Sequence, residues 1–245
     1  MAAAKKTEVV SVKPIDMRTV CIKIVGDSPL IVHEWNEKAR KEILDHETSE
    51  SSGKAKKKHS IKIPVRDFIN SIYWLTNKPD INQDDVFTER EAQKIQEDCM
   101  KKYREAIKSG AKFGFPATAI KKASVTGAYG LGMTQDMRKS KIAFFIQASP
   151  LDHTGFLSEL VASEPVMRED MVHVGINQTD IRHRAMFEKW EIPLTVKYNA
   201  NGRYTLTDII NIINAGGATM GIGEWRNEKD GTFGMYHVEA ADAVK

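Results

Sequence analysis

The amino-acid sequence predicts an α+β fold in which helices cover one face of an antiparallel sheet. Segment 190–198 alternates apolar and polar residues, as a strand with one buried face does. Segment 206–213 repeats its isoleucines at helical spacing, and Thr205 or Thr207 can cap this helix. Strand-like segments lie near both ends of the chain with helical patterns between them, which favours a mixed architecture.

Composition limits the class of protein. The chain has 245 residues, which is enough to bury a core in one large or two small domains. Its apolar runs are too short to span a bilayer, and its first residues lack the apolar stretch of a secretory signal. Cys21 and Cys99 form neither a disulfide framework nor a zinc-ligand spacing. We therefore expect a cytoplasmic protein without a metal, a cofactor or a membrane contact.

In the first half of the chain, residues 1–17 are expected to form a polar tail ahead of a single domain at 18–245. Residues 46–60 contain no large apolar side chain, and such a segment is expected to form a mobile loop. Thr88 and Glu91 have the spacing of a capping box. The expected elements are strands at 19–25 and 30–33 and helices at 36–45, 65–75 and 88–108.

In the second half, a proline near its first turn favours a helix that starts at 115–117 and ends in the glycine-rich segment 127–132. Segment 150–184 gives no clear order of elements. Gly216 and Gly217 are expected to end the helix that starts after Thr205 or Thr207. The remaining expected elements are strands at 141–148, 190–198 and 232–238. The pattern suggests a ferredoxin-like (RRM-like) core with a large helical and loop insertion at about 36–110.

The segment 216–226 is the most informative for function. Glycines such as Gly221 and Gly223 let backbone amides approach a phosphate, because no Cβ intervenes. Arg226 could pair with that phosphate, and Trp225 could stack on an unpaired base. The alternative is a tight helix-to-strand turn with Trp225 in the core. The segment has the spacing of neither a P-loop nor a dinucleotide-binding loop.

Three further groups of cations are candidates for contact with nucleic acid. A lysine run lies in the polar loop, a lysine pair lies near the start of a helix, and two arginines flank His183. The alternative for each group is an ordinary solvated or ion-paired surface. The net charge is only +3, so the distribution of charge, not its total, indicates this role. The residues are Lys54, Lys56, Lys57, Lys58, Lys121, Lys122, Arg182 and Arg184.

Motifs of the common enzyme classes are absent from the sequence. It contains no His-Glu-x-x-His, Cys-x-x-Cys or Gly-x-Ser-x-Gly, and no pair of histidines has helical metal-binding spacing. His33 or His183 could act as a general acid or base without a metal. We expect a protein that is not an enzyme and has no catalytic residue.

Two segments carry a resemblance to a known family. Phe-Pro-Ala-Thr-Ala-Ile-Lys-Lys-Ala at 115–123 and the glycine-rich stretch at 216–234, ahead of a closing strand, resemble the RAMP superfamily of CRISPR systems, particularly its Cas7-like backbone proteins. The chain departs from the family at 227–231, where Asn-Glu-Lys-Asp-Gly replaces a Ser-Arg-Gly run. The pattern also resembles bacteriophage proteins, which would make this chain a phage-encoded relative.

The resemblance implies a protein that coats single-stranded nucleic acid, RNA rather than DNA, as a homo-oligomer or as part of a multi-subunit complex. It implies contact with the ligand through the helix near Pro116 and through the C-terminal glycine-rich loop. Two alternatives stay open at this point. One is a RAMP-type endoribonuclease that uses His33 or His183, and the other is a structural or inhibitory phage protein without affinity for nucleic acid.

Overall fold

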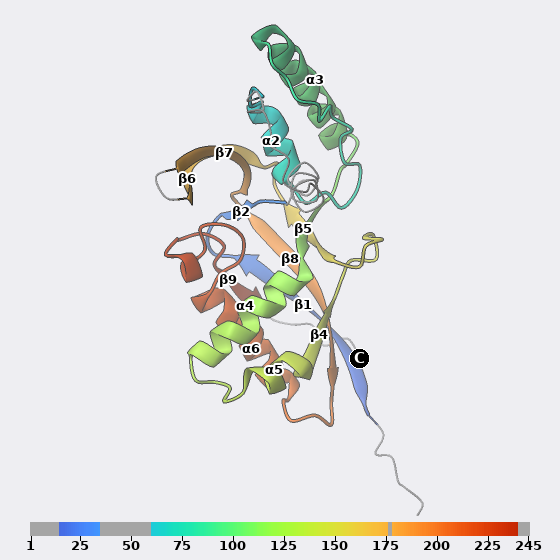
Figure 1. Ribbon diagram of the computed structural model, residues 1–245. Coiled ribbons are helices and arrows are strands. Elements are labelled where there is room, and N and C mark those ends of the chain that lie inside the picture. Colours follow the sequence, from blue (N-terminus) through green and yellow to red (C-terminus); the bar gives the residue numbers. More distant parts are fainter. Residues whose placement is uncertain (1–14, 35–59, 176–177, 240–245) are drawn as a thin grey trace, which may run out of the picture.

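The computed structural model describes residues 15–34, 60–175 and 178–239 (Figure 1). Its antiparallel sheets and helices confirm the predicted α+β class. The strands are β1 (Met17–Gly26), β2 (Leu30–Val32), β3 (Phe113–Pro116), β4 (Phe144–Gln147), β5 (Leu157–Ala162), β6 (Val166–Gly175), β7 (Gln178–Phe187), β8 (Trp190–Asn199) and β9 (Tyr236–Glu239). The helices are α2 (Pro64–Ser71), α3 (Glu89–Lys108), α4 (Ala117–Gly130), α5 (Met137–Ala143), α6 (Leu206–Thr219) and the short 3₁₀ helix η1 (Asn227–Lys229).

The main sheet has the strand order β3-β5-β8-β1-β9, and β4 also pairs with β8. Strands β1 and β8 run antiparallel over almost their whole length, from Met17 opposite Asn199 to Val25 opposite Glu191. The other pairs of this sheet are antiparallel as well. A second sheet, with the order β2-β7-β6, carries the long hairpin of β6 and β7.

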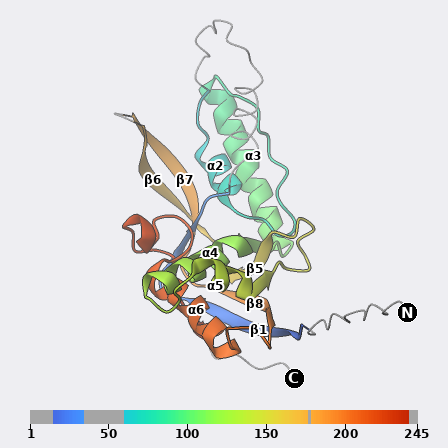
Figure 2. The ribbon, with the colours of Figure 1, turned by 60° about the horizontal axis from the view of Figure 1, so that its bottom comes forward.

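One face of the main sheet is buried under helices. Trp190, Ile192, Leu194, Val196 and Tyr198 alternate along β8 with half-buried or exposed residues, as the sequence pattern predicted. Helices α4 and α6 pack against each other, and Figure 2 shows both grouped with α5 beside β1 and β8. The sheet and these helices therefore enclose a shared apolar core.

The prediction that Gly216 and Gly217 end a helix is wrong, because α6 continues through both glycines to Thr219. A Cβ at Gly216 would lie 2.5 Å from the Ser124 backbone nitrogen, and one at Gly217 would overlap the Tyr236 carbonyl oxygen. The two glycines thus allow α6 to lie close to α4 and β9. Helix α4, by contrast, ends at Gly130, within the predicted glycine-rich segment 127–132.

Two helix caps follow the sequence prediction. The Thr88 side chain accepts from the Glu91 amide at the start of α3. Thr205, not Thr207, caps α6 in a reciprocal capping box with Asp208.

Several boundaries differ from their predictions for local reasons. The first residues of the predicted strand 141–148 belong to α5, which Asp136 caps by accepting from the Arg138 and Lys139 amides. Strand β4 therefore begins only at Phe144. The predicted helix 65–75 ends at Ser71. The start of α4 at Ala117 lies within the predicted range 115–117, directly after Pro116, which closes β3. The predicted closing strand 232–238 begins only at Tyr236.

Two insertions separate the strands of the main sheet. The first was predicted at about 36–110, and its described part contains α2 and α3, which project at the top of Figure 1. The second is the β6–β7 hairpin, which together with β5 of the main sheet makes up most of the segment that the sequence left unordered. The predicted helix at 36–45 and nearly all of the predicted loop at 46–60 lie outside the described residues. No helix in the described part of the chain is long and apolar enough to cross a membrane.

Candidate nucleic-acid interface

The glycine loop, residues 220–235, connects α6 to β9 and folds back on itself. The Ile222 amide donates to the Gly234 carbonyl at 2.9 Å, and the Phe233 amide donates to the Trp225 carbonyl at 3.1 Å. The Glu224 amide donates to the Ile31 carbonyl at 2.9 Å, which ties the loop to β2. These bonds give the loop a defined shape that does not depend on a ligand.

The glycines of this loop serve its own packing. Gly221 and Gly223 have φ of 69° and 78°, which suits glycine because it has no Cβ. A Cβ at Gly223 would overlap the Ile31 carbonyl oxygen. The Gly221 amide donates to the Gly216 carbonyl at 2.9 Å, so this amide does not form the phosphate cradle that the sequence suggested. Gly221 and Gly223 instead shape the loop that presents Trp225 and Arg226.

Trp225 combines an exposed ring with a left-handed backbone conformation. Its side chain is 40% exposed, so the alternative that it belongs to the core is wrong. Its backbone has φ of 51°, a left-handed conformation that strains a bulky residue by about 1–3 kcal/mol. The fold therefore holds a strained tryptophan whose ring stays in contact with solvent. Such outliers concentrate at functional sites.

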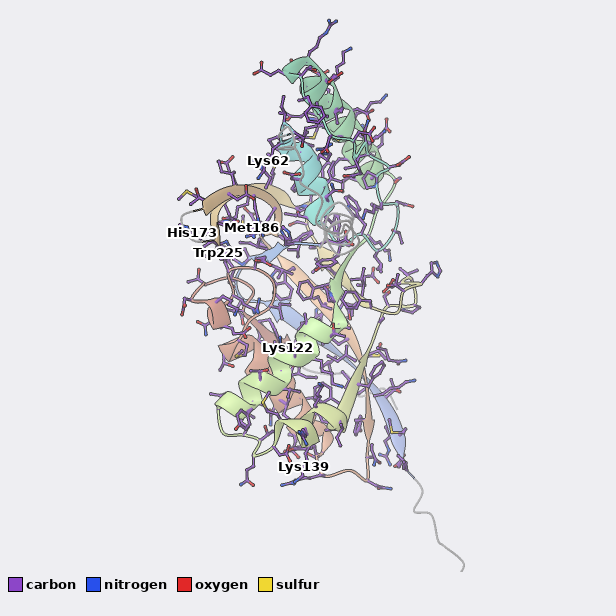
Figure 3. The ribbon with its side chains drawn as sticks, viewed as in Figure 1. Lys62, Lys122, Lys139, His173, Met186 and Trp225 are labelled. Carbon is purple, nitrogen blue, oxygen red and sulfur yellow. The ribbon has the colours of Figure 1, made fainter. Side chains whose placement is uncertain are left out.

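A cavity of about 270 Å³ lies between the β6–β7 hairpin and the glycine loop, and we call it the hairpin–loop pocket. Figure 3 shows the labelled His173 and Trp225 close together at its position. Four cationic side chains and one carboxylate line it, which favours an anionic ligand. The lining residues are Val172, His173, Arg182, Arg184, Glu224, Trp225, Arg226 and Lys229.

Two of the predicted arginines reach this pocket with accessible side chains. Arg226 donates from Nε to Glu228 at 2.8 Å and from a terminal nitrogen to the Gly223 carbonyl at 2.9 Å, which holds its guanidinium against the glycine loop. Its side chain is 26% exposed. Arg182 lies 3.8 Å from Asp180 and is also partly exposed. Both guanidinium groups can therefore approach a phosphate.

Arg184 also lines the pocket but is buried, unlike Arg182 and Arg226. Its side chain is only 4% exposed, so direct contact with a phosphate is disfavoured. Its terminal nitrogens lie 3.7 Å from Asp170 and 3.6 Å from Glu224, and its Nε donates to His33 Nδ1 at 3.1 Å. Arg184 thus joins the hairpin, the glycine loop and the residue after β2, and it forms the floor of the pocket.

The two histidines considered as a general acid or base lie at the base of the hairpin, not in the pocket lining. Burial lowers the pKa of His33, and the neighbouring charge of Arg184 lowers it further. The hydrogen bond from Arg184 requires a neutral His33 ring, because Nδ1 must be unprotonated to accept it. His183 is buried, with Nε2 3.1 Å from a Glu169 carboxylate oxygen. These placements give both histidines structural partners.

The predicted lysines on α4 point to different neighbours. Lys121 lies over the Phe144 ring, 5.4 Å from its centroid. Lys122 is exposed, and its charge lowers the pKa of Glu228, although the hydrogen bond from Arg226 is the larger cause. Lys122 therefore lies near enough to Glu228 of the glycine loop for the two charges to interact. The Ala117 amide at the start of α4 donates to the Phe156 carbonyl, so it does not serve an anion.

The predicted lysine run Lys54, Lys56, Lys57 and Lys58 lies outside the described residues. Within the described ranges, no group of three or more His, Cys, Asp or Glu side chains could hold a metal ion. Comparison with models of protein families and with curated proteins finds no match for the chain. The function of the site is therefore inferred from its own geometry.

Proposed function

We propose that the protein binds single-stranded nucleic acid at the hairpin–loop pocket, with Trp225 stacking on an unpaired base and Arg226 and Arg182 pairing with phosphates. The observation that carries this proposal is the exposed Trp225 ring on strained backbone, beside cations. Stacking of bases on aromatic rings above a cationic groove is the usual mode of sequence-tolerant binding to single strands. The proposed role is binding without catalysis, since neither His33 nor His183 lines the pocket and the His33 ring accepts from Arg184.

We also propose a ferredoxin-like core for this protein. The order β9-β1-β8-β4 with antiparallel neighbours supports it, because α4 follows β1 and α6 follows β8 along the chain. The same order supports the proposed relationship to Cas7-like RAMP proteins, with the β6–β7 hairpin as an insertion. The preference for RNA over DNA rests on that resemblance. A cytoplasmic location fits the free Cys21 and Cys99 thiols.

Two exposed apolar patches support the proposed multimer. On the hairpin face opposite the pocket, Met171 pairs with Ile181, and Met167 and the exposed Glu169 share that face. The second patch lies where α4 meets α5, near the cations Arg138 and Lys139 and away from the hairpin, toward the bottom of Figure 1. It consists of Tyr129, Leu131, Met133 and Met137. Two different patches at separate places on the molecule fit head-to-tail association, with Glu169 beside one and cations beside the other.

Met171→Asp is expected to lower the mass of the assembly, because it places a charge in the first patch. Met171 is 69% exposed, so the variant should fold. Light scattering after size exclusion, with and without oligonucleotide, measures the effect. Leu151→Asp, at an exposed position outside both patches, is the matched control. A wild-type protein that remains a monomer in both conditions contradicts the multimer.

Trp225→Gly is expected to weaken binding to a single-stranded RNA oligonucleotide by roughly five- to 150-fold, the equivalent of about 1–3 kcal/mol for one stacked base. Glycine adopts φ of 51° without strain, so the free energy of unfolding should stay within about 1 kcal/mol of wild type. Titrations at several salt concentrations and a thermal melt measure both effects. The equivalent DNA oligonucleotide tests the preference for RNA.

Wild-type affinity should fall steeply with salt through counterion release, and Arg226→Ala should reduce the salt slope by about 1. A salt-independent affinity, or no affinity at all, contradicts the proposed function. A Trp225→Gly protein that melts much lower while binding normally shows instead that the loop is scaffold.

A further inference from the structure

The Phe145 side chain on β4 is exposed and does not belong to the apolar core. Its side chain is 55% exposed, whereas its neighbours Phe144 and Ile146 supply the buried contacts of the strand. Its partner in the register is Lys197 on β8, so the two side chains share one face of the sheet. The Lys121 ammonium lies 6.0 Å from the centroid of the Phe145 ring. An open aromatic ring thus has cations beside it.

The cations around this ring are not matched by acids. Within residues 15–34, 60–175 and 178–239, no carboxylate pairs with Lys121, Lys141 or Lys197 in a salt bridge. Burial lowers the pKa of Lys121, and the nearby charge of Lys141 lowers it further. Unpaired, mutually repelling cations are stabilised when an anion approaches.

Helix α4 connects this ring to the hairpin–loop pocket. Successive residues on a helix point about 100° apart, so Lys121 can lie beside Phe145 while the charge of Lys122 reaches Glu228 in the glycine loop. Figure 3 shows Lys122 on α4, between the labelled Trp225 and Lys139 in that view. The two adjacent lysines therefore mark a cationic path across α4.

We propose that Phe145 is a second stacking site for single-stranded nucleic acid. In this proposal the phosphate backbone crosses α4 along Lys122 and Lys121 and then passes the edge strand β4 to reach Phe145 on the other face of the sheet. This inference rests on the proposed function and adds a length requirement to it. We expect a dinucleotide to occupy the pocket alone, and an RNA of about twelve nucleotides, within the range of known single-strand sites, to reach both rings.

Phe145→Ser is expected to weaken binding to a single-stranded RNA of about twelve nucleotides by roughly tenfold and to leave binding of a dinucleotide unchanged. Trp225→Gly should weaken binding of both ligands. Phe87→Ser changes a phenylalanine of similar exposure next to α3 and is the matched control. Affinities, thermal melts and light scattering are measured for each variant.

The outcomes separate the two proposals. Wild type that binds neither ligand overturns the proposed function, and this inference with it. Trp225→Gly that loses both ligands, with Phe145→Ser equal to wild type on both, overturns the second site alone. A Phe145→Ser protein that melts lower or changes its oligomeric state makes Phe145 a packing or interface residue, which also overturns the second site.

Discussion

Gly217→Ala is expected to destabilise the protein by about 3 kcal/mol or more, because a Cβ at this position would overlap the Tyr236 carbonyl oxygen. Tyr236 is almost fully buried at the start of β9, so its backbone cannot move away without separating β9 from β1. The nearest alternative is for α6 to shift, which would disturb its packing on α4. Chemical denaturation of the variant and of wild type measures the loss.

Gly130→Ala is the matched control. Gly130 is the last residue of α4, and a Cβ there would meet no atom within 4 Å. Alanine favours a helix over glycine by about 0.5–1 kcal/mol, so this variant should be as stable as wild type or slightly more stable. If both glycine variants unfold at the same denaturant concentration, Gly217 does not mark a close approach of α6 to β9.

This contrast explains why the sequence misplaced the end of α6. A pair of glycines after an apolar helical pattern is typical of a helix end, and nothing local distinguishes it from a site of close packing. The distinction depends on Ser124 and Tyr236, which come from other parts of the chain. By contrast, the caps at Thr88 and Thr205 are local, and the sequence predicted them.

The hairpin of β6 and β7 escaped prediction for a related reason. Strands are normally recognised by an apolar residue at every second position. On the pocket side of this hairpin those positions hold charged residues instead, including Arg168, Asp170 and Arg184. They pair with one another and with the glycine loop, and the Arg168 guanidinium lies over the Phe233 ring. The missed pocket residues Val172 and His173 belong to this hairpin.

The sequence predicted those residues of the candidate site that are adjacent in the chain. Trp225 and Arg226 follow the glycines directly, so the motif itself indicated them. Lys229 was missed because it sits in the segment that departs from the family pattern. Arg184 was assigned to phosphate because a charged residue gives no local sign of burial. Its partners come from three separate elements, and only the fold brings them together.

Arg184→Ala is therefore expected to cost about 3–5 kcal/mol of folding stability, the usual effect of removing one partner from a buried ion pair. The Asp170 side chain is only 4% exposed, and it would lose the charge 3.7 Å away while keeping its bond from Arg168. Glu224 would lose its tie to the hairpin. The pocket should loosen as a result, so affinity for single-stranded RNA should fall together with stability.

Arg182→Ala, on the same strand β7 as Arg184, is expected to weaken binding with little effect on stability. The Arg182 side chain is 38% exposed and lies near Asp180, which also pairs with Lys62, so its removal should change stability by less than about 0.5 kcal/mol. Because Arg182 lines the pocket, its loss should weaken RNA binding and lower the salt slope by about 1. Denaturation and salt titrations on both variants test the division. If Arg184→Ala is as stable as wild type and only binding is lost, then Arg184 contacts the ligand directly and does not stabilise the fold from the floor of the pocket.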